Sequence, residues 1–227
     1  MAEVEFDRGW SDRGRRIGNR LVKTGYRAKA LHPERVPVTG PVIIVSNHTG
    51  FLDGPVVFCL APRTVHFLVK KSYFKSVWGK VLTGVGQIPI EQRTGDREAL
   101  AAAKSLLAQG YAVGIFPEGT RGSGTVETAH QGAAWLALQT GAQIIPTATL
   151  GTRGTGSGRE SWPKPGARLR VVFGEAFALP DYTGVPGRQK LALATEEIRE
   201  RLARQVSAAV VETGLVLPSD APPPPSN

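Results

Sequence analysis

Cysteine, methionine and long apolar runs are scarce in this chain of 227 residues, which has one cysteine and one methionine. The single cysteine, Cys59, excludes an internal disulfide framework and is typical of a reducing compartment. The longest apolar run, PVVFCLAP, falls well short of the roughly 18–20 residues that a spanning helix needs. The polar N-terminus, MAEVEFDRGW, has no secretory signal pattern. We therefore expect any membrane attachment to be peripheral.

Negative charge is also in short supply. The chain has 28 Lys and Arg against 19 Asp and Glu, which gives a formal net charge of +9 and a pI near 10.0. A basic chain favours an anionic partner, which means nucleic acid, a phosphate-bearing substrate or an acidic membrane surface. No recognised nucleic-acid motif accompanies the charge, and positive residues are densest in residues 8–30. We therefore expect no nucleic-acid partner.

The N-terminal segment, residues 1–37, is basic overall, with its arginines and lysines densest in residues 8–30. Trp10, Ile17 and Leu21 are spread among its arginines and lysines. A basic amphipathic helix of this kind is typical of an anionic membrane surface, and a helix packed on the domain with its charges outward is an equal alternative. The other predicted units are a core at 38–178, a C-terminal helix packed on that core at 179–216, and a disordered tail with four consecutive prolines at 217–227.

Apolar strands alternate with helical segments in the middle of the chain. The pattern predicts strands at 41–46, 64–70, 87–91, 111–116, 143–150 and 168–174. It predicts helices at 53–60, 73–83, 96–109, 130–140 and 187–212. The clearest is 96–109, with Thr94 or Asp96 as its starting cap and Gly110 as its stop. This alternation predicts an α/β fold with a mainly parallel or mixed β-sheet flanked by helices.

Chemistry in such a sheet gathers in the loops beyond the carboxyl ends of the strands. The loop after 41–46 reads NHTGFLD and carries His48 and Asp53. Gly50 permits a tight turn, and Asp53 can begin the next helix, so the bend can return the carboxylate to the imidazole. Such a carboxylate fixes the tautomer and leaves the other nitrogen to take a proton. We interpret His48 as a general base; the alternative is a helix cap beside a locally packed histidine.

Other catalytic classes find no support in the sequence. No serine lies in a G-x-S-x-G elbow, and the position of Ser46 on a strand gives no poised nucleophile. Cys59 lies in VVFCLA, which is typical of a small core residue. The histidines show no zinc-type spacing, and no glycine-rich phosphate loop opens a helix. We therefore expect neither a metal nor a cofactor.

The loop after 111–116 reads PEGTR. Pro117 redirects the chain, Gly119 lets backbone approach a ligand, and Arg121 offers a planar fork of donors that suits phosphate. Glu118 is predicted to orient the Arg121 guanidinium; the alternative is a surface turn with an incidental ion pair. Together the two loops indicate a substrate with both a hydroxyl and a phosphate.

These two blocks carry a family resemblance. NHTGFLD resembles the H-x4-D block, and FPEGTR matches the E-G-T-R block, of the glycerolipid acyltransferases, specifically the 1-acylglycerol-3-phosphate (lysophosphatidate) acyltransferases. Residues 69–93, which end in IPIEQR, and residues 141–149, GAQIIPTAT, are similar to two further family blocks. The resemblance covers residues 38–178, which it identifies as an acyltransferase catalytic core.

The resemblance implies a mechanism. His48 would deprotonate the free hydroxyl of a lysophospholipid while Asp53 orients it, and the hydroxyl would attack the thioester of acyl-CoA or acyl-carrier protein without an acyl-enzyme intermediate. The implied phosphate-binding residues are Glu118, Gly119, Thr120 and Arg121, with added positive charge from Arg93 or Lys70. Ile145 and Pro146 would shape an acyl or thioester-side surface. The expected product is phosphatidate, made at the cytoplasmic face of a membrane.

One block departs from the family pattern, because Gln92 stands where arginine usually follows the acid and Arg93 comes one residue later. His130 is predicted to be a loop or helix-start residue. The glycine-rich stretch 151–161 is predicted to be a mobile surface loop, with a cradle for a coenzyme A phosphate as the alternative. Three functional alternatives stay open: another lysophospholipid or glycolipid acceptor, a lipid esterase or thioesterase that uses the same His–Asp pair, and a non-catalytic binding module.

Overall fold

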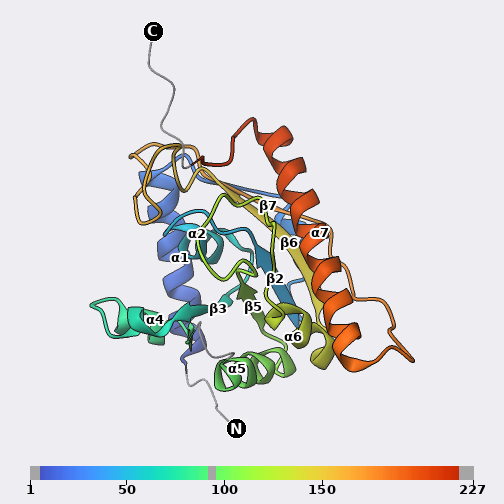
Figure 1. Ribbon diagram of the computed structural model, residues 1–227. Helices are drawn as coiled ribbons and strands as arrows, with labels where there is room; N and C mark the ends of the chain where they lie inside the picture. The colour runs from blue at the N-terminus through green and yellow to red at the C-terminus, as the bar shows by residue number, and fades with distance from the viewer. Residues whose placement is uncertain (1–5, 92–95, 220–227) are drawn as a thin grey trace.

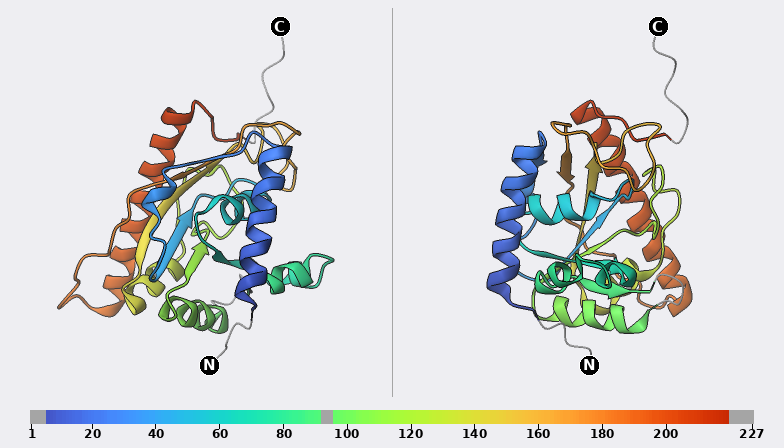
Figure 2. Two further views of the ribbon diagram at one scale, coloured as in Figure 1. Left: turned by 180° about the vertical axis from the view of Figure 1, so that it is seen from behind. Right: turned by 90° about the vertical axis from the view of Figure 1, so that its left-hand side faces the viewer.

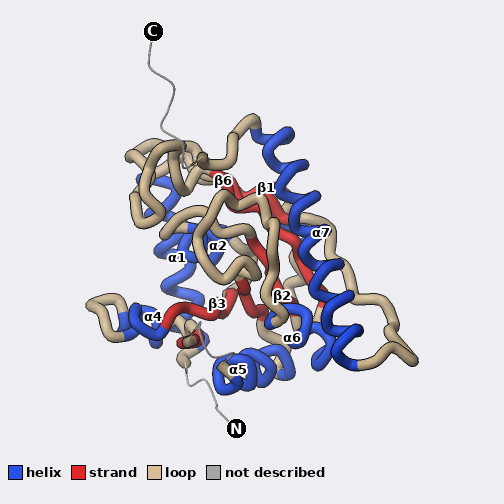
Figure 3. Tube along the Cα trace, viewed as in Figure 1, coloured by secondary structure: helices blue, strands red, loops and turns tan. Residues whose placement is uncertain are grey.

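A computed structural model describes residues 6–91 and 96–219 of the chain. Its strands are β1 (Lys29–Leu31), β2 (Val42–Ser46), β3 (Val65–Lys70), β4 (Ile88–Ile90), β5 (Ala112–Ile115), β6 (Gln143–Leu150) and β7 (Arg170–Phe173). Its helices are α1 (Arg8–Gly25), the 3-10 turn η1 (Pro33–Arg35), α2 (Asp53–Leu60), α3 (Lys71–Phe74), α4 (Gly79–Gly84), α5 (Arg97–Ala108), α6 (Gly132–Thr140) and α7 (Gly187–Thr213). Figure 3 shows these elements along the chain trace.

The described strands form one seven-stranded sheet in the order β1-β7-β6-β2-β5-β3-β4. Every neighbouring pair is parallel except β6 and β7, which run antiparallel. The central strand β2 is buried at every position, because a parallel sheet with helices on both faces offers no solvated side. The predicted α/β fold with a mainly parallel or mixed sheet is confirmed.

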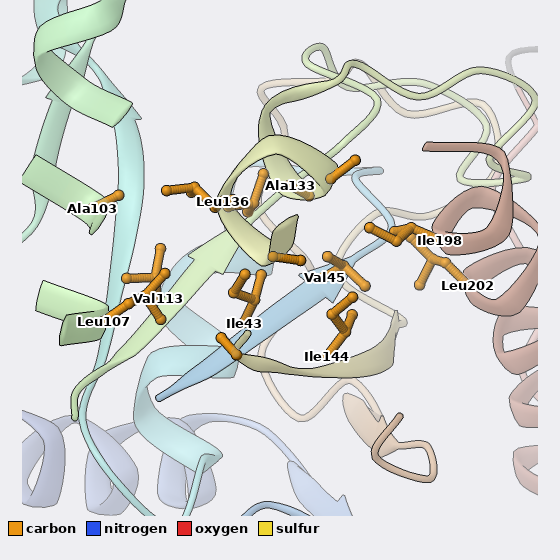
Figure 4. Close-up of a cluster of buried hydrophobic side chains, with 14 of the residues drawn as sticks. Ile43, Val45, Ala103, Leu107, Val113, Ala133, Leu136, Ile144, Ile198 and Leu202 are labelled. Atoms are coloured by element: carbon orange, nitrogen blue, oxygen red, sulfur yellow. The ribbon is translucent and has the colours of Figure 1, made fainter. Parts of the chain in front are cut away.

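Helices cover both faces of the sheet. One face packs against α5, α6 and α7, and Figure 4 shows Ile43 and Val45 of β2 pointing into this layer beside Leu136 and Ile198. The other face packs against α2, through Ile44 and neighbours on β3, β6 and β7. Both α1 and α2 lie on the side opposite α7 (Figures 1 and 2). The result is a three-layer sandwich that holds the strand ends rigidly.

Helix α1 packs on α2 through small and polar residues. The Asn19 amide donates to the Cys59 carbonyl at 2.8 Å, and the Arg15 guanidinium donates to the Ala61 carbonyl at 3.0 Å. A Cβ added at Gly18 would lie 2.4 Å from the Cys59 sulfur. The outward face of α1 is exposed and carries Trp10, Arg13, Arg16, Ile17, Arg20 and Leu21. The helix is therefore packed on the domain and still keeps a basic and apolar outer surface.

Two predictions about elements need correction. The sheet begins before the predicted core boundary at 38, because β1 pairs with β7; three residues are too few to show a strand pattern. The helix predicted at 73–83 is two short helices. A Cβ at Gly79 would lie 1.9 Å from the Phe74 carbonyl oxygen, so the chain turns tightly there instead of continuing.

The predicted start of α5 and the predicted C-terminal tail can be compared with the structure. Asp96 caps α5, because its carboxylate accepts from the backbone N–H groups of Glu98 and Ala99 at 3.1 and 3.0 Å; Thr94 lies outside the described residues. In the segment predicted to be a disordered tail, Leu217 packs against the core and the Ser219 carbonyl accepts a backbone hydrogen bond, so this part is packed.

Within the described part of the chain, every helix is too short or too polar to cross a membrane.

Candidate active site

The two motif loops meet at the carboxyl end of the sheet. They follow β2 and β5, which are adjacent and parallel, so both chains leave the sheet on the same side. The His48 backbone N–H donates to the Glu118 carboxylate at 2.8 Å, and the Gly122 backbone N–H donates to the His48 carbonyl at 2.8 Å. The backbone of His48 is therefore fixed from both ends by the PEGTR loop.

His48 and Asp53 form the pair that the sequence predicted. The Nδ1 atom of His48 lies 2.9 Å from Oδ2 of Asp53, whose side chain is completely buried at the start of α2. The same oxygen accepts the backbone N–H groups of Thr49 at 2.6 Å and Gly50 at 2.9 Å. These backbone donors hold the carboxylate in one orientation. Asp53 is therefore not the cap of α2, whose N-cap residue is Leu52, and its carboxylate binds the histidine loop instead.

The imidazole of His48 is held by stacking as well as by Asp53. Its ring packs face to face on Phe116, with the ring centres 4.2 Å apart, and Phe116 stacks in turn on Phe67. The side chain is 15% exposed. Because Nδ1 is directed at Asp53, Nε2 is the nitrogen available to a substrate. This arrangement suits a general base that takes a proton from a bound hydroxyl.

A third loop, after β6, completes the network and was missed from the sequence. The Thr152 hydroxyl donates to the Asp53 carboxylate and also lies 3.2 Å from the Thr49 hydroxyl. Asn47 and Thr149 exchange two hydrogen bonds that tie the ends of β2 and β6 together. Thr152 and Arg153 are buried, whereas most of 154–160 is exposed. The loop prediction for 151–161 therefore fails at its start, where the chain supports the site.

Glu118 serves the histidine loop, and the prediction that it orients Arg121 is wrong. Its carboxylate accepts the His48 backbone N–H. Burial raises the pKa of Glu118 to about 7, the hydrogen bond from His48 opposes this shift, and the nearby Asp53 and Glu127 carboxylates raise the pKa further. This half-buried acid supports the histidine loop through its hydrogen bond with His48. Its predicted role in phosphate binding stays a prediction.

Arg121 has other partners. Its guanidinium forms an ion pair with Glu160 and donates to the Tyr73 hydroxyl at 3.0 Å. It also lies over the Phe51 ring, 5.4 Å from the ring centre. The Arg121 side chain is largely buried, whereas Glu160 is exposed. An exposed carboxylate and a tyrosine hydroxyl thus share the donors of the guanidinium that was predicted to bind phosphate.

The other predicted phosphate-binding residues lie around this loop. Gly119 adopts a positive φ of 69°, and a Cβ there would collide with the His130 ring at 2.5 Å, so glycine is required. Thr120 is exposed at the tip of the loop, and Lys70 is exposed at the carboxyl end of β3. His130 precedes α6 as a loop residue, as predicted. Arg93 lies outside the described residues.

Ile145 and Pro146 lie deeper than predicted. Both are buried in β6, and Ile145 belongs to the core beneath α2. They offer no open surface to a thioester in this structure, and they support the strand that carries Thr149 and the Thr152 loop. Their role on the acyl or thioester side stays a prediction.

Ser46 and Cys59, which the sequence did not favour as nucleophiles, are both buried. Ser46 is fully buried, and its hydroxyl lies 2.9 Å from the Thr149 hydroxyl. Burial raises the pKa of the Cys59 thiol to about 11, partly offset by the Arg15 charge, which makes Cys59 an inert core residue. Across residues 6–91 and 96–219, no three His, Cys, Asp or Glu side chains converge in a way that would hold a metal ion.

Known proteins resemble this chain in both sequence and fold. A family model described as Acyltransferase matches residues 27–149. The 1-acyl-sn-glycerol-3-phosphate acyltransferase of Bacillus subtilis is 28% identical over 176 residues, which cover 77% of this chain and 85% of that protein. A Chlamydomonas reinhardtii protein of the same name is 34% identical over 153 residues, covering 65% of this chain and 46% of that protein.

Similarity of fold extends further. The crystal structure of PlsC, the 1-acyl-sn-glycerophosphate acyltransferase from Thermotoga maritima, superposes with a TM-score of 0.67 at 20% identity and covers 87% of this chain and 78% of that one. At this identity the likeness shows the fold alone. The family model, however, spans more than half of the chain and contains both motif loops. The chain is therefore an acyltransferase and belongs to the family that this model describes.

Proposed function

We propose that this acyltransferase moves a fatty acyl chain from acyl-CoA or acyl-carrier protein to the free hydroxyl of lysophosphatidate. The product is phosphatidate, a step in phospholipid biosynthesis. The observation that carries this proposal is the His48–Asp53 pair, 2.9 Å apart, with the guanidinium of Arg121 on the neighbouring loop. A base and a phosphate-binding cation on adjacent loops fit an acceptor that has both a hydroxyl and a phosphate.

The reaction needs one proton transfer in each direction. Nε2 of His48 accepts the proton of the acceptor hydroxyl as its oxygen attacks the thioester carbonyl. The tetrahedral intermediate collapses, the carbon–sulfur bond breaks, and the thiolate takes the proton from the imidazolium. Asp53 stabilises the imidazolium and keeps the ring oriented throughout. The acyl group passes directly to the acceptor, so no nucleophilic side chain is needed.

The acceptor phosphate binds at Arg121 in this proposal. The guanidinium is rigidly held, because Tyr73 accepts one of its hydrogen bonds and Phe51 lies under its plane. A phosphate monoester matches its fork of donors with two parallel hydrogen bonds. To bind there, the phosphate replaces the Glu160 carboxylate. Lys70 and Arg93 add positive charge nearby, and Gly119 and Thr120 complete the loop.

The proposal includes neither a metal nor a cofactor, because the activated thioester is itself the second substrate. It also places the enzyme at the cytoplasmic face of a membrane as a peripheral protein, where its acceptor and product reside. The exposed basic and apolar surface of α1 suits an anionic bilayer. Whether the donor is coenzyme A or carrier protein is decided by the experiment below.

The test measures thiol release from oleoyl-CoA and oleoyl-carrier protein, each with and without lysophosphatidate. His48→Ala is compared with His130→Ala, a matched control because His130 is an exposed histidine on an adjacent loop segment. We expect acceptor-dependent release that falls by about 10²–10⁴-fold in His48→Ala and persists in His130→Ala, with thermal unfolding unchanged. Unchanged turnover in His48→Ala would contradict the mechanism. Release that needs no acceptor would indicate a hydrolase, and release only with another lysolipid would change the acceptor.

A further inference from the structure

An exposed apolar tip stands out from the body of the molecule between β3 and β4. We call residues 70–84, which comprise α3, α4 and the turn between them, the α3–α4 hairpin. At its tip, Val77 is 89% exposed, Trp78 57% and Val81 50%. Residues 78 and 81 are three apart and so share one face of α4. Such a cluster of large apolar side chains in water signals a binding surface.

The hairpin is also uniformly basic. It contains Lys70, Lys71, Lys75 and Lys80 and no acidic residue. All four lysines are exposed. Lysines around an apolar tip can keep their ammonium groups among lipid phosphates while the tip enters the interface. The charge pattern therefore complements an anionic bilayer surface.

Its position connects the hairpin to α1 and to the active site. Figures 1 and 2 show α4 projecting away from the sheet. At the C-terminal end of the hairpin, a Cβ on Gly84 would lie 2.7 Å from the indole nitrogen of Trp10, so the hairpin adjoins the exposed face of α1. At the N-terminal end of the hairpin, the Tyr73 hydroxyl accepts a hydrogen bond from the Arg121 guanidinium. Tyr73 and the exposed Trp162 both flank Phe51, with ring centres 5.8 and 5.6 Å away.

We propose that the α3–α4 hairpin inserts its tip, Val77 and Trp78, into the interfacial region of an anionic bilayer. The occupant is lipid and not another protein, because an apolar tip on a segment whose only charged residues are lysines matches anionic head groups and acyl chains together. The proposal deepens the proposed function and rests on it in one respect: a hairpin that docks beside Arg121 brings a lysolipid phosphate to the site while its acyl chain stays in the membrane.

The first experiment reports the environment of the tip. Val77→Cys and Val211→Cys in the full chain are each labelled with an environment-sensitive fluorophore. Val211, on α7 across the sheet, is 84% exposed and is a matched control. Native Cys59 is buried and its raised pKa protects it from labelling. With phosphatidylcholine vesicles that contain phosphatidylglycerol, we expect a blue shift at residue 77 and none at residue 211. No shift at residue 77 while the protein sediments with these vesicles would overturn the proposal.

The second experiment measures binding without turnover, so it stands whether or not lysophosphatidate is the acceptor. Val77→Asp should lower partition onto phosphatidylglycerol-containing vesicles about tenfold, the loss of one anchoring side chain, whereas Val211→Asp should not. Both variants should keep the thermal unfolding of the parent. Equal binding by the two variants would overturn the proposal. So would vesicle-free self-association that Val77→Asp abolishes, because the tip would then be a contact between copies of the chain.

Discussion

Thr152 links the loop after β6 to Asp53, the carboxylate that the proposed mechanism pairs with His48. Its hydroxyl donates to Asp53, and it is fully buried. Thr152→Val keeps the shape of the side chain and removes this donor from a charged acceptor. We expect kcat to fall by about ten- to a hundredfold with little change in KM, because the interaction orients the base and touches no substrate. Thr152→Ser should restore kcat. A rise in KM alone, or failure of serine to rescue, would contradict this positioning role.

Glu118 gives the stability of the protein a distinct pH dependence. Its pKa is raised from 4.5 to about 7 in the folded state, chiefly by burial. Between these values the folded protein holds a proton that the unfolded chain has lost. Folding is therefore favoured less as the pH rises from about 4.5 to about 7, and the effect is complete above the folded pKa.

Glu118→Gln removes this titration and keeps an oxygen that accepts the His48 N–H. The stability of the variant relative to the parent should rise by on the order of 1–2 kcal/mol between about pH 5 and pH 7.5, after allowance for partial exposure. Urea unfolding at several pH values measures the difference. If the difference in unfolding free energy between variant and parent stays constant across this pH range, the Glu118 carboxyl group titrates normally.

Sequence patterns predicted the His48–Asp53 pair but missed the residues that hold the site in place. His48 and Asp53 lie five apart in one loop, so a local motif reveals them. Thr152 lies about a hundred residues away, and Tyr73 and Glu160 reach Arg121 from two further segments. Only the strand order, with β2 between β5 and β6, brings these segments together, and a single sequence does not disclose that order.

At the scale of elements, the contact of α1 with α2 depends on one glycine. A Cβ at Gly18 would lie 2.4 Å from the Cys59 sulfur, closer than any real contact. Gly18→Ala should therefore lower the free energy of unfolding by about 1–3 kcal/mol through overpacking. Gly25→Ala is the control, since nothing lies within 4 Å of its Cβ position.

The double variant Gly18→Ala/Cys59→Ala tests the cause. Replacing the sulfur with hydrogen makes room for the new methyl group, so the two changes should couple and part of the lost stability should return. Urea unfolding of the four proteins of this cycle gives the coupling energy. Strictly additive effects would show that Gly18 matters for a reason other than its contact with Cys59.

Elements differed in how well they could be predicted. The helix 53–60 and the strand 143–150 have the predicted bounds, because each combines a clear apolar run with a defined start and stop. The helix predicted at 73–83 breaks at Gly79, where backbone packing on Phe74 overrides helix propensity. Strand β1 owes its existence to pairing with β7, and its three residues carry no pattern of their own.

For the whole molecule, the net charge of +9 is spread unevenly, and we propose that this unevenness orients the protein on an anionic membrane. Deleting the basic segment would remove β1 from the sheet, so point variants are the sound test. Arg20→Glu should weaken binding to phosphatidylglycerol-containing vesicles about tenfold, whereas Arg188→Glu on α7 should not. Raising the salt from about 0.1 M to 1 M should abolish the difference, because the screening length falls from about 10 Å to 3 Å. Equal losses for both variants would indicate attraction by net charge alone.

The ion pair of Arg121 with Glu160 has a consequence for selectivity. In the proposed function, Glu160 competes with the acceptor head group for Arg121, so the head group binds by exchange with this carboxylate. A phosphate monoester, with more charge and three acceptor oxygens, wins such an exchange. A neutral head group brings no negative charge to replace that of the displaced Glu160 carboxylate. We therefore expect the enzyme to discriminate against uncharged lipids through this exchange of anions at Arg121.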